Sequence, residues 1–327
     1  MKLLIIGCGS IGCRHARVAS ELGDYEIALC DAIPASLQRI AGELGIQETY
    51  TDMDAAIRLS GADAAIVCTP NHLHAAPTIA ALKAGMDVLC EKPIATSLED
   101  ASAMVAAARE SGRKLMVGYT LRATLGVQKV KELLDSGRLG KIVSARVVLD
   151  APETLTCART PFRAKYETGG GVMYDYTHQL DFCGYFFGPA RSCFARVDSR
   201  LPYLATCDDS AEGIVDYDGL TVNYHWDYVQ WTGKNRNYVS IIGEKGVIEF
   251  FYKGSLSVSF YDGSSETYEL ADDHERNNSF KRQLGMFAQY CREGACKGVC
   301  TGENALADLR LASALYESNR QRRMIDL

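Results

Sequence analysis

Three glycines near the start of the chain have the spacing of a phosphate-binding turn. The run GCGSIG at residues 7–12 follows an apolar segment, residues 2–6, and opens a helical pattern. In such a turn the first glycine permits a tight bend, the second lets a pyrophosphate approach the backbone, and the third lets the helix pack close to the strand. Backbone N–H groups at the start of the helix then attract phosphate oxygens. The residues expected to hold a dinucleotide here are Gly7, Gly9, Ser10, Ile11 and Gly12.

An acidic residue stands where a contact to the ribose is expected. Asp31 follows the second apolar segment, residues 26–30, and lies about 20 residues after the glycine turn, as in dinucleotide-binding folds. Its carboxylate would accept hydrogen bonds from the ribose hydroxyls and repel a 2′-phosphate. The next three residues, Ala-Ile-Pro at 32–34, include no arginine that could hold a 2′-phosphate. NAD is therefore favoured over NADP.

The motif Glu91-Lys92-Pro93 ends another apolar segment, residues 88–90. An X–Pro bond adopts the cis form at modest cost, and a bend here would aim Lys92 into the crevice at the carboxyl ends of the strands, where parallel sheets bind ligands. There the lysine could hydrogen-bond a reacting oxygen or take part in proton transfer. Taken by itself, the motif fits a solvated loop lysine equally well.

A polar segment follows a further expected strand, residues 64–68. Thr69, Asn71 and His74 lie where contacts to the nicotinamide ribose would fall. Together with Glu91 and Lys92 they complete the expected coenzyme contacts. For His74, a position at the start of a helix with no ligand is an equal alternative.

An acid and a histidine follow three consecutive glycines, residues 169–171. Asp175 and His178 are three residues apart, which predicts that they share a helix face. A neutral imidazole can take the proton of a hydroxyl whose carbon gives up a hydride, and a neighbouring carboxylate raises its basicity and fixes its tautomer. Asp181 adds a carboxylate one turn later. The alternative for such a pair is a capping or surface contact.

The elements that must position these residues fall into two patterns. Up to about residue 120, short apolar strands alternate with amphipathic helices, which predicts an α/β Rossmann domain with a doubly wound parallel sheet. Residues 121–327 form the second expected domain, α+β with a large, mostly antiparallel open sheet, in which Asp218-Gly219 and Asp262-Gly263 predict hairpin turns. Helices are expected at residues 279–293 and 303–321, and the last could pack back on the first domain.

The composition is that of an ordinary soluble protein. The net charge of −6 and the lack of a basic block argue against nucleic acid or an anionic membrane as partner. The start is too short for a signal peptide. Cys291, Cys296 and Cys300 could be imagined as metal ligands, but twelve cysteines without a CxxC pair favour reduced thiols. We therefore expect a cytoplasmic protein with no metal.

These motifs together resemble the Gfo/Idh/MocA family of sugar and polyol dehydrogenases. The resemblance covers nearly the whole chain and rests on residues 7–12, Asp31, 69–74, 91–93, 117–119 with Arg122, 169–181 and 305–327. It implies that the open sheet serves as an oligomer interface, hence a homodimer or homotetramer. By motif, it implies that Lys92, Asp175 and His178 are catalytic. Many members have three residues between the last two, whereas this chain has only Tyr176 and Thr177. His178 remains the favoured base because Asp181 keeps the common spacing after it.

The expected substrate is a small sugar or polyol. Arg159, Lys165 and the four residues expected to contact the substrate, Tyr119, Arg122, Arg163 and Tyr166, lie in segments that could face the cleft. Clustered basic side chains could hold a carboxylate or phosphate, although plain surface charge is the alternative. The expected reaction is hydride transfer between NAD and a secondary alcohol or ketone of a sugar, polyol or sugar derivative. A redox-neutral, NAD-assisted sugar-modifying enzyme and a non-catalytic dinucleotide sensor remain open.

Overall fold

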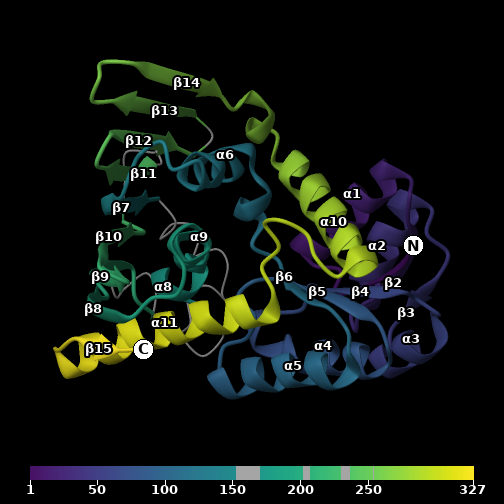
Figure 1. Cartoon of the computed structure of the whole chain (residues 1–327). Helices are drawn as coiled ribbons and strands as arrows, with labels where there is room; N and C mark the ends of the chain where they lie inside the picture. Colours follow the sequence, from purple (N-terminus) through teal and green to yellow (C-terminus); the bar gives the residue numbers. More distant parts are fainter. Residues whose placement is uncertain (152–169, 202–206, 230–235, 253) are drawn as a thin grey trace. The chain divides into compact units, whose positions relative to one another are not determined.

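The computed structural model describes residues 1–151, 170–201, 207–229, 236–252 and 254–327. The chain forms two compact units, the first made of residues 1–123 and 276–306, the second of residues 124–275 and 307–327 (Figure 1). The sequence pattern predicts one boundary, near residue 120. In the structure the chain also returns to the first unit, through residues 276–306.

The first unit contains a six-stranded sheet with the order β3-β2-β1-β4-β5-β6. Every neighbouring pair of strands is parallel, and the order reverses between β1 and β4, as in a doubly wound dinucleotide-binding fold. The predicted Rossmann sheet is thus confirmed. Its strands are β1 (Lys2–Ile6), β2 (Glu26–Cys30), β3 (Thr49–Tyr50), β4 (Ala64–Val67), β5 (Asp87–Cys90) and β6 (Leu115–Val117).

Helices connect these strands and begin and end where the sequence supplies the signals. Ser97 caps one of them by accepting a hydrogen bond from the N–H of Asp100, and glycines in the left-handed conformation at Gly23, Gly45 and Gly112 end three of them, as expected. The helical elements of the unit are α1 (Ser10–Leu22), α2 (Pro34–Leu44), α3 (Met53–Leu59), η1 (Asn71–Leu73), α4 (Ala75–Lys83), α5 (Leu98–Ser111), η2 (Thr120–Ala123) and α10 (Arg276–Glu293).

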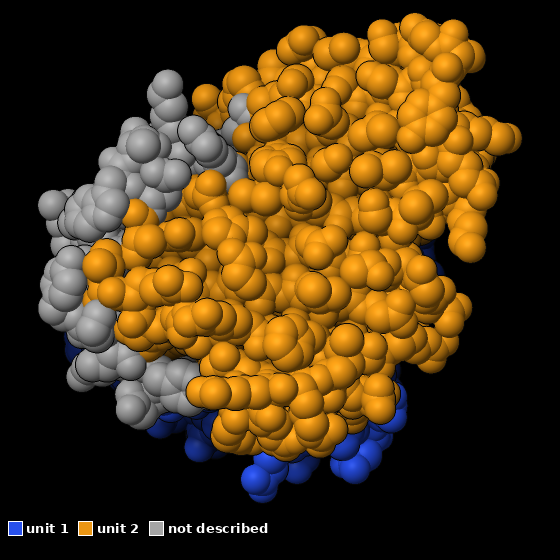
Figure 2. Space-filling view, turned by 90° about the vertical axis from the view of Figure 1, so that its left-hand side faces the viewer, with its two compact units in different colours: residues 1–123, 276–306 blue, residues 124–275, 307–327 orange. Residues whose placement is uncertain are grey.

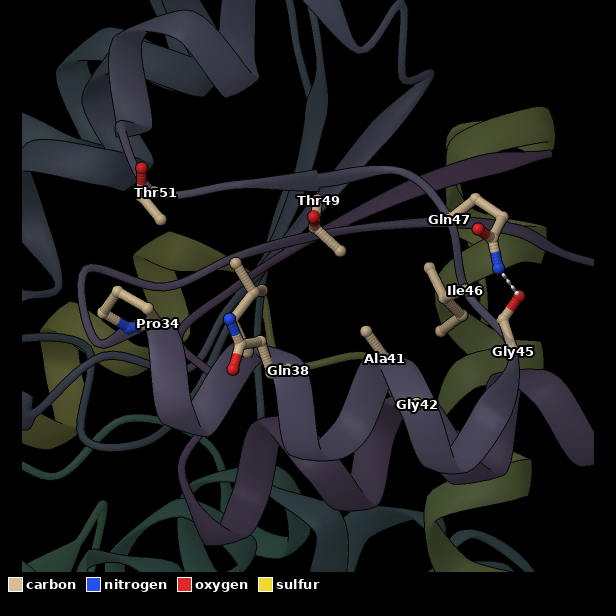
Figure 3. Close-up of a pocket in the computed structure, with 10 residues that line it drawn as sticks. Pro34, Gln38, Ala41, Gly42, Gly45, Ile46, Gln47, Thr49 and Thr51 are labelled. Carbon is tan, nitrogen blue, oxygen red and sulfur yellow. Dashed lines mark hydrogen bonds between the residues drawn. The ribbon is translucent and has the colours of Figure 1, made fainter.

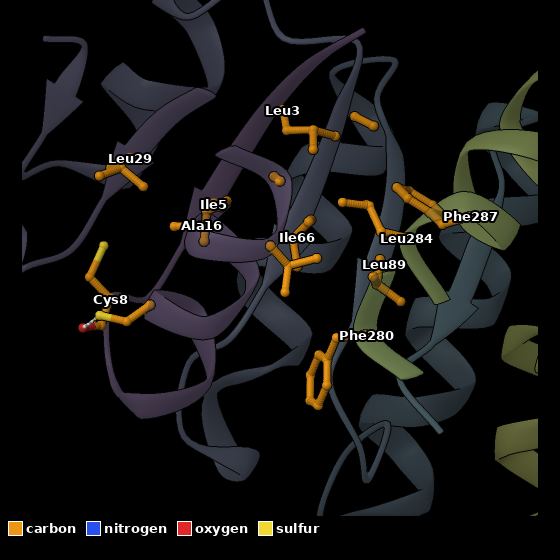
Figure 4. Close-up of a cluster of buried hydrophobic side chains, with 14 of the residues drawn as sticks. Leu3, Ile5, Cys8, Ala16, Leu29, Ile66, Leu89, Phe280, Leu284 and Phe287 are labelled. Carbon is orange, nitrogen blue, oxygen red and sulfur yellow. Dashed lines mark hydrogen bonds between the residues drawn. The ribbon is translucent and has the colours of Figure 1, made fainter. Parts of the chain in front are cut away.

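A late segment of the chain completes the core of the first unit. Helices α1, α2 and α10 lie on one face of the sheet, and α4 and α5 lie on the other (Figure 1). Phe280, Leu284 and Phe287 of α10 pack against strand residues such as Ile5 and Ile66 in one buried cluster (Figure 4). Burial of each such side chain is worth about 1.5–3 kcal/mol, so α10 is an integral part of this unit.

The second unit is built on a nine-stranded sheet with the order β14-β13-β12-β11-β7-β10-β9-β8-β15. All neighbouring pairs are antiparallel except β7 with β10, which confirms the predicted mostly antiparallel sheet. Asp218 and Gly219 both have positive φ, 57° and 89°, as a two-residue hairpin turn between β9 and β10 requires. The strands are β7 (Ile142–Asp150), β8 (Ser192–Asp198), β9 (Ser210–Tyr217), β10 (Leu220–Asp227), β11 (Arg236–Gly243), β12 (Gly246–Phe251), β13 (Ser255–Phe260), β14 (Ser265–Glu269) and β15 (Ile325–Asp326).

Buried and exposed residues alternate along the strands of this sheet. Successive side chains of a strand point to opposite faces, so one face of the sheet is buried and the other is open. Among the helices described, none combines the length and the apolar composition needed to cross a bilayer. The helical elements of the unit are α6 (Leu125–Asp135), α8 (Val172–Asp175), α9 (Thr177–Phe187), η4 (Ala271–His274) and most of α11 (Gly302–Gln321).

Candidate active site

The glycine turn between β1 and α1 leaves no room for side chains at two of its three glycines. A Cβ on Gly7, whose φ is +97°, would lie 2.7 Å from the backbone carbon of Cys68, and one on Gly12 would lie 1.8 Å from the carbonyl oxygen of Gly7. Among the described residues, a Cβ on Gly9 would meet nothing within 4 Å. Gly7 and Gly12 therefore shape the turn, and Gly9 keeps open the space that an approaching pyrophosphate would use.

The start of α1 suits an anionic ligand. Helix α1 begins at Ser10, no side chain caps it, and its first turn holds no acidic residue, so its dipole and its first N–H groups favour phosphate oxygens. Burial raises the pKa of the Cys8 thiol in the turn to about 12, which keeps this thiol uncharged. The residues present thus fit the pyrophosphate of a dinucleotide.

Asp31 lies directly against the same turn. Its Oδ2 accepts a hydrogen bond from the backbone N–H of Cys8 at 2.6 Å, and its Oδ1 accepts one from the N–H of Ile33 at 2.8 Å. These two bonds fix the carboxylate at the end of β2. Each carboxylate oxygen can accept more than one hydrogen bond, so the group can still receive ribose hydroxyls, as NAD recognition requires.

The lysine motif lies at the end of β5 in the same unit, and its Lys92–Pro93 peptide bond is cis. The Glu91 carboxylate is buried: its Oε1 lies 2.8 Å from Nε2 of His15, and its Oε2 accepts the backbone N–H of Lys92 at 3.3 Å. His15 is not among the residues that the sequence motifs single out. A signal was present, because His15 shares the buried face of α1 with Gly12, Ala16 and Ala19 at helical spacing.

The segment after β4 places the imidazole of His74 against the protein's own backbone. His74 is buried at the start of α4, its Nδ1 lies 2.8 Å from the carbonyl oxygen of Pro93, and its Nε2 lies 2.9 Å from that of Thr69. Burial lowers its pKa. Both ring nitrogens therefore face the protein's own backbone, which favours the alternative of a helix-start residue without a ligand. Thr69 donates to the carbonyl of Leu73, and Asn71 begins η1.

Two of the four expected substrate residues lie in the first unit. Tyr119 and Arg122 are both buried, and Nη1 of Arg122 donates to the carbonyl oxygen of Val299 at 2.9 Å. This hydrogen bond ties η2 to a later segment of the same unit. Arg163 and Tyr166, like Arg159 and Lys165, lie outside the described residues.

The expectation that Asp175 and His178 share one helix face is wrong. Asp175 ends α8 and His178 lies in the first turn of α9, because Tyr176 between the helices has φ −103° and ψ 27° and interrupts the helix. Tyr228 donates to Oδ2 of Asp175 at 2.9 Å, and its ring packs edge-on against the ring of Tyr176. The short spacing between acid and histidine is thus accommodated by a helix break.

A buried acid that we did not single out from the sequence fixes the start of α8. Oδ2 of Asp208 accepts the N–H of Met173 at 3.1 Å, and Oδ1 accepts the hydroxyl of Tyr316 at 2.7 Å. A Cβ on Gly171, whose φ is +102°, would lie 2.5 Å from Oδ1, which explains the last glycine of the triplet. Burial raises the pKa of Asp208.

A shallow hollow on the first unit lies between α2 and β3 (Figure 3). Pro34, Gln38, Ala41, Thr49 and Thr51 are among the residues that line it. It includes none of the predicted site residues, so we give it no part in the chemistry.

Comparison with known proteins now identifies the class. Residues 1–119 match the model of an oxidoreductase family with an NAD-binding Rossmann fold, and residues 127–249 match the Gfo/Idh/MocA C-terminal domain. The protein is therefore an NAD-dependent oxidoreductase. It belongs to the Gfo/Idh/MocA family, and the resemblance seen in the sequence is confirmed.

Its relatives carry more than one activity in their names. The chain is 28% identical to the 2,7-anhydro-N-acetylneuraminate hydratase of Escherichia coli, covering 87% of this chain and 78% of that one. It is 24% identical to the inositol 2-dehydrogenase of Rhizobium meliloti, covering 99% and 98%. An Agrobacterium radiobacter oxidoreductase, solved with NAD⁺, L-tartaric acid and magnesium, has the same fold, with a TM-score of 0.89 at 24% identity over 100% and 98% of the two chains.

Proposed function

We propose that this enzyme transfers a hydride between NAD and the carbon that bears a secondary hydroxyl or carbonyl group in a sugar, polyol or sugar derivative. The observation that carries the proposal is the position of Lys92, at the carboxyl end of β5 in the same unit as the glycine turn and Asp31. Ligands of doubly wound sheets bind at these strand ends. The similarity to an inositol 2-dehydrogenase supports a polyhydroxylated substrate.

In this proposal NAD supplies the hydride acceptor, and the protein moves the proton. His178 takes the hydroxyl proton, and the Lys92 ammonium hydrogen-bonds the reacting oxygen as charge builds on it. Asp175, held by the Tyr228 hydroxyl, supports the base. Contacts to the substrate by Tyr119 and Arg122, and by Arg163 and Tyr166, remain part of the proposal.

The test is direct hydride transfer. We expect NADH to form when the enzyme and NAD are mixed with a panel that includes myo-inositol, aldoses, glucosides and uronic acids. A substrate that carries deuterium on the reacting carbon should deliver the label to NADH, which mass spectrometry detects. Absence of NADH formation and of label transfer across the panel, by an enzyme that binds NAD, would contradict the proposal and favour a dinucleotide sensor.

A second candidate is redox-neutral chemistry, and the specific observation that favours it is the similarity to a hydratase that acts on an anhydro sugar. The same lysine and histidine would serve a transient oxidation that is later reversed. The two functions differ in one measurement. Conversion of 2,7-anhydro-N-acetylneuraminate or a glycoside without net NADH would support the second candidate.

We also propose that the protein forms a homodimer or homotetramer through the open face of its nine-stranded sheet. Large apolar side chains point outward there, including Phe194, Ile214, Ile242 and Phe251, which are 38%, 43%, 38% and 46% exposed. Phe194 and Ile214 pair across β8 and β9. Figure 2 shows the surface of the second unit, to which both strands belong. Exposed apolar patches of this kind mark interaction sites. We expect sedimentation to show an oligomer that Ile214→Glu dissociates, whereas a monomeric parent protein would contradict this.

Small molecules and further copies of the chain are the only partners in this proposal. The net charge of −6 gives no reason to include nucleic acid or a membrane. The cysteines of the described part of the chain are free thiols, as expected in a reducing compartment, and we place the enzyme in the cytoplasm.

A further inference from the structure

A buried pair of a histidine and a carboxylate lies next to the backbone of the proposed catalytic lysine. His15 of α1 is 0% exposed and Glu91 is 9% exposed, and Nε2 of His15 lies 2.8 Å from Oε1 of Glu91. The ring of Phe280 from α10 meets the imidazole edge-on at 5.2 Å. The pair is thus enclosed by elements of the first unit.

The surroundings favour one tautomer of the histidine. Nδ1 of His15 is buried and has no hydrogen-bond partner among the described residues. A proton on Nδ1 would be a buried N–H without an acceptor, which costs free energy, whereas a proton on Nε2 points at the carboxylate and leaves only a lone pair unused. In this tautomer the ring donates a hydrogen bond to Oε1 of Glu91.

The other oxygen of Glu91 reaches the lysine. Oε2 accepts the backbone N–H of Lys92 at 3.3 Å. Gly118, which follows β6, leaves the space that this carboxylate occupies, because a Cβ there would lie 3.0 Å from its Cδ and Oε1. On the C-terminal side of Lys92, the carbonyl oxygen of the next residue, Pro93, lies 2.8 Å from Nδ1 of His74. Both neighbours of the lysine are thus held by buried histidines.

Packing alone does not account for such a pair. Two polar groups taken out of water lose hydration, and apolar side chains of the same volume stabilise a core as well or better. We infer that His15 and Glu91 are positioning residues that hold the Lys92 backbone, and with it the ε-amine, in the orientation needed for hydride transfer. This inference rests on the proposed function of Lys92. His15 lies five residues after Ser10, where α1 begins, so a single helix carries both the coenzyme turn and this support.

A set of three variants separates positioning from packing. His15→Phe keeps the ring volume but removes the donor, and His15→Gln restores an N–H that can reach Glu91. Val18→Ala removes buried apolar volume from the same helix, three residues after His15, without touching the histidine–carboxylate contact, and serves as the control for lost stability. For each variant we would measure kcat, KM, the NAD dissociation constant and Tm, using the panel compound that the parent enzyme turns over fastest.

We expect His15→Phe to lower kcat by roughly 10- to 100-fold, since a displacement of about 1 Å in a catalytic group has effects of this size. The NAD dissociation constant should change little, and His15→Gln should recover most of the activity. We would also compare the single variants His15→Phe and Glu91→Gln with the double variant. The kcat of the double variant should be no lower than that of the worse of these two single variants, because the two residues act through one contact.

A second readout needs neither substrate nor coenzyme. Acetylation by acetic anhydride, followed by mass spectrometry, gives the reaction rate of Lys92 relative to the exposed Lys83. We expect this ratio to change in His15→Phe and to remain at the parent value in Val18→Ala and His15→Gln. A His15→Phe enzyme with the parent kcat and the parent ratio would overturn the inference, as would losses that merely follow Tm in all three variants.

The failure of this inference is distinguishable from failure of the proposed function. If Lys92→Met abolishes turnover while His15→Phe leaves it intact, Lys92 is catalytic and the inference is wrong. If Lys92→Met itself leaves turnover intact, the proposed role of the lysine is wrong.

Discussion

Lys92→Met is expected to lower kcat by roughly 10²- to 10⁴-fold, the range associated with loss of a group that acts on the proton or charge of the reacting oxygen. Methionine keeps most of the length and volume of the side chain but carries no charge and donates no hydrogen bond. The backbone contacts of this segment, from Lys92 N–H to Glu91 and from the Pro93 carbonyl to His74, do not involve the ε-amine. Folding should therefore be preserved.

Affinity for NAD distinguishes a chemical role from a binding role. The Asp31 carboxylate is held at the glycine turn by the backbone N–H groups of Cys8 and Ile33. Titration calorimetry should therefore give a dissociation constant for NAD within about twofold of the parent value, a change in binding free energy of less than about 0.5 kcal/mol. Lys83→Met, on the exposed face of α4, is the matched control and should keep full activity.

The second unit gives a parallel expectation. The kcat of His178→Ala should also fall, since a general base contributes on the order of 10²- to 10⁴-fold. This reduction in kcat should be smaller at high pH, where hydroxide replaces the base. If Lys92→Met and His178→Ala both turned over the best panel substrate at the parent rate, the assignment of the active site would be wrong, whatever the coenzyme affinity.

Features set by neighbouring residues could be predicted from the sequence. The strand, glycine turn and helix at residues 2–22 follow from apolar spacing and three glycines. The turn at Asp218 and Gly219 follows from two residues that tolerate positive φ. The parallel order of the first sheet follows from the alternation of strands and helices. Each of these depends on contacts within one or two consecutive elements.

Features set by distant residues could not be predicted in this way. The contact of His15 with Glu91 joins residues 76 positions apart, and that of Tyr228 with Asp175 joins residues 53 apart. The periodicity of residues 172–187 fits one helix, but the hydroxyl and ring of Tyr228 hold its first turn apart from the rest. Helix α10 likewise has an ordinary amphipathic pattern that does not state which unit it completes.

The other large effect is expected at the glycine turn, where two alanine substitutions should fail in different ways. In Gly12→Ala, the new Cβ would lie 1.8 Å from the carbonyl oxygen of Gly7, and because that oxygen belongs to the backbone, the turn itself must move. We expect a loss of stability on the order of 3 kcal/mol, at the upper end for overpacked sites, with a clearly lower Tm and no measurable binding of NAD.

Gly9→Ala is the matched comparison, because it adds the same methyl group three positions earlier, where space is open among the described residues. Gly9 has φ −70° and ψ −166°, which alanine adopts without strain, and its Cβ would lie more than 4 Å from every atom of the part of the chain that the structure describes. Stability should stay within about 0.5 kcal/mol of the parent value. The methyl group would nevertheless stand where a pyrophosphate must approach the start of α1, so calorimetry should show NAD affinity reduced by at least about tenfold, or 1.4 kcal/mol. A Gly9→Ala protein that binds NAD as tightly as the parent would mean that the coenzyme does not lie against this turn, and Asp31 and Ser10 would then lose their assigned roles as well.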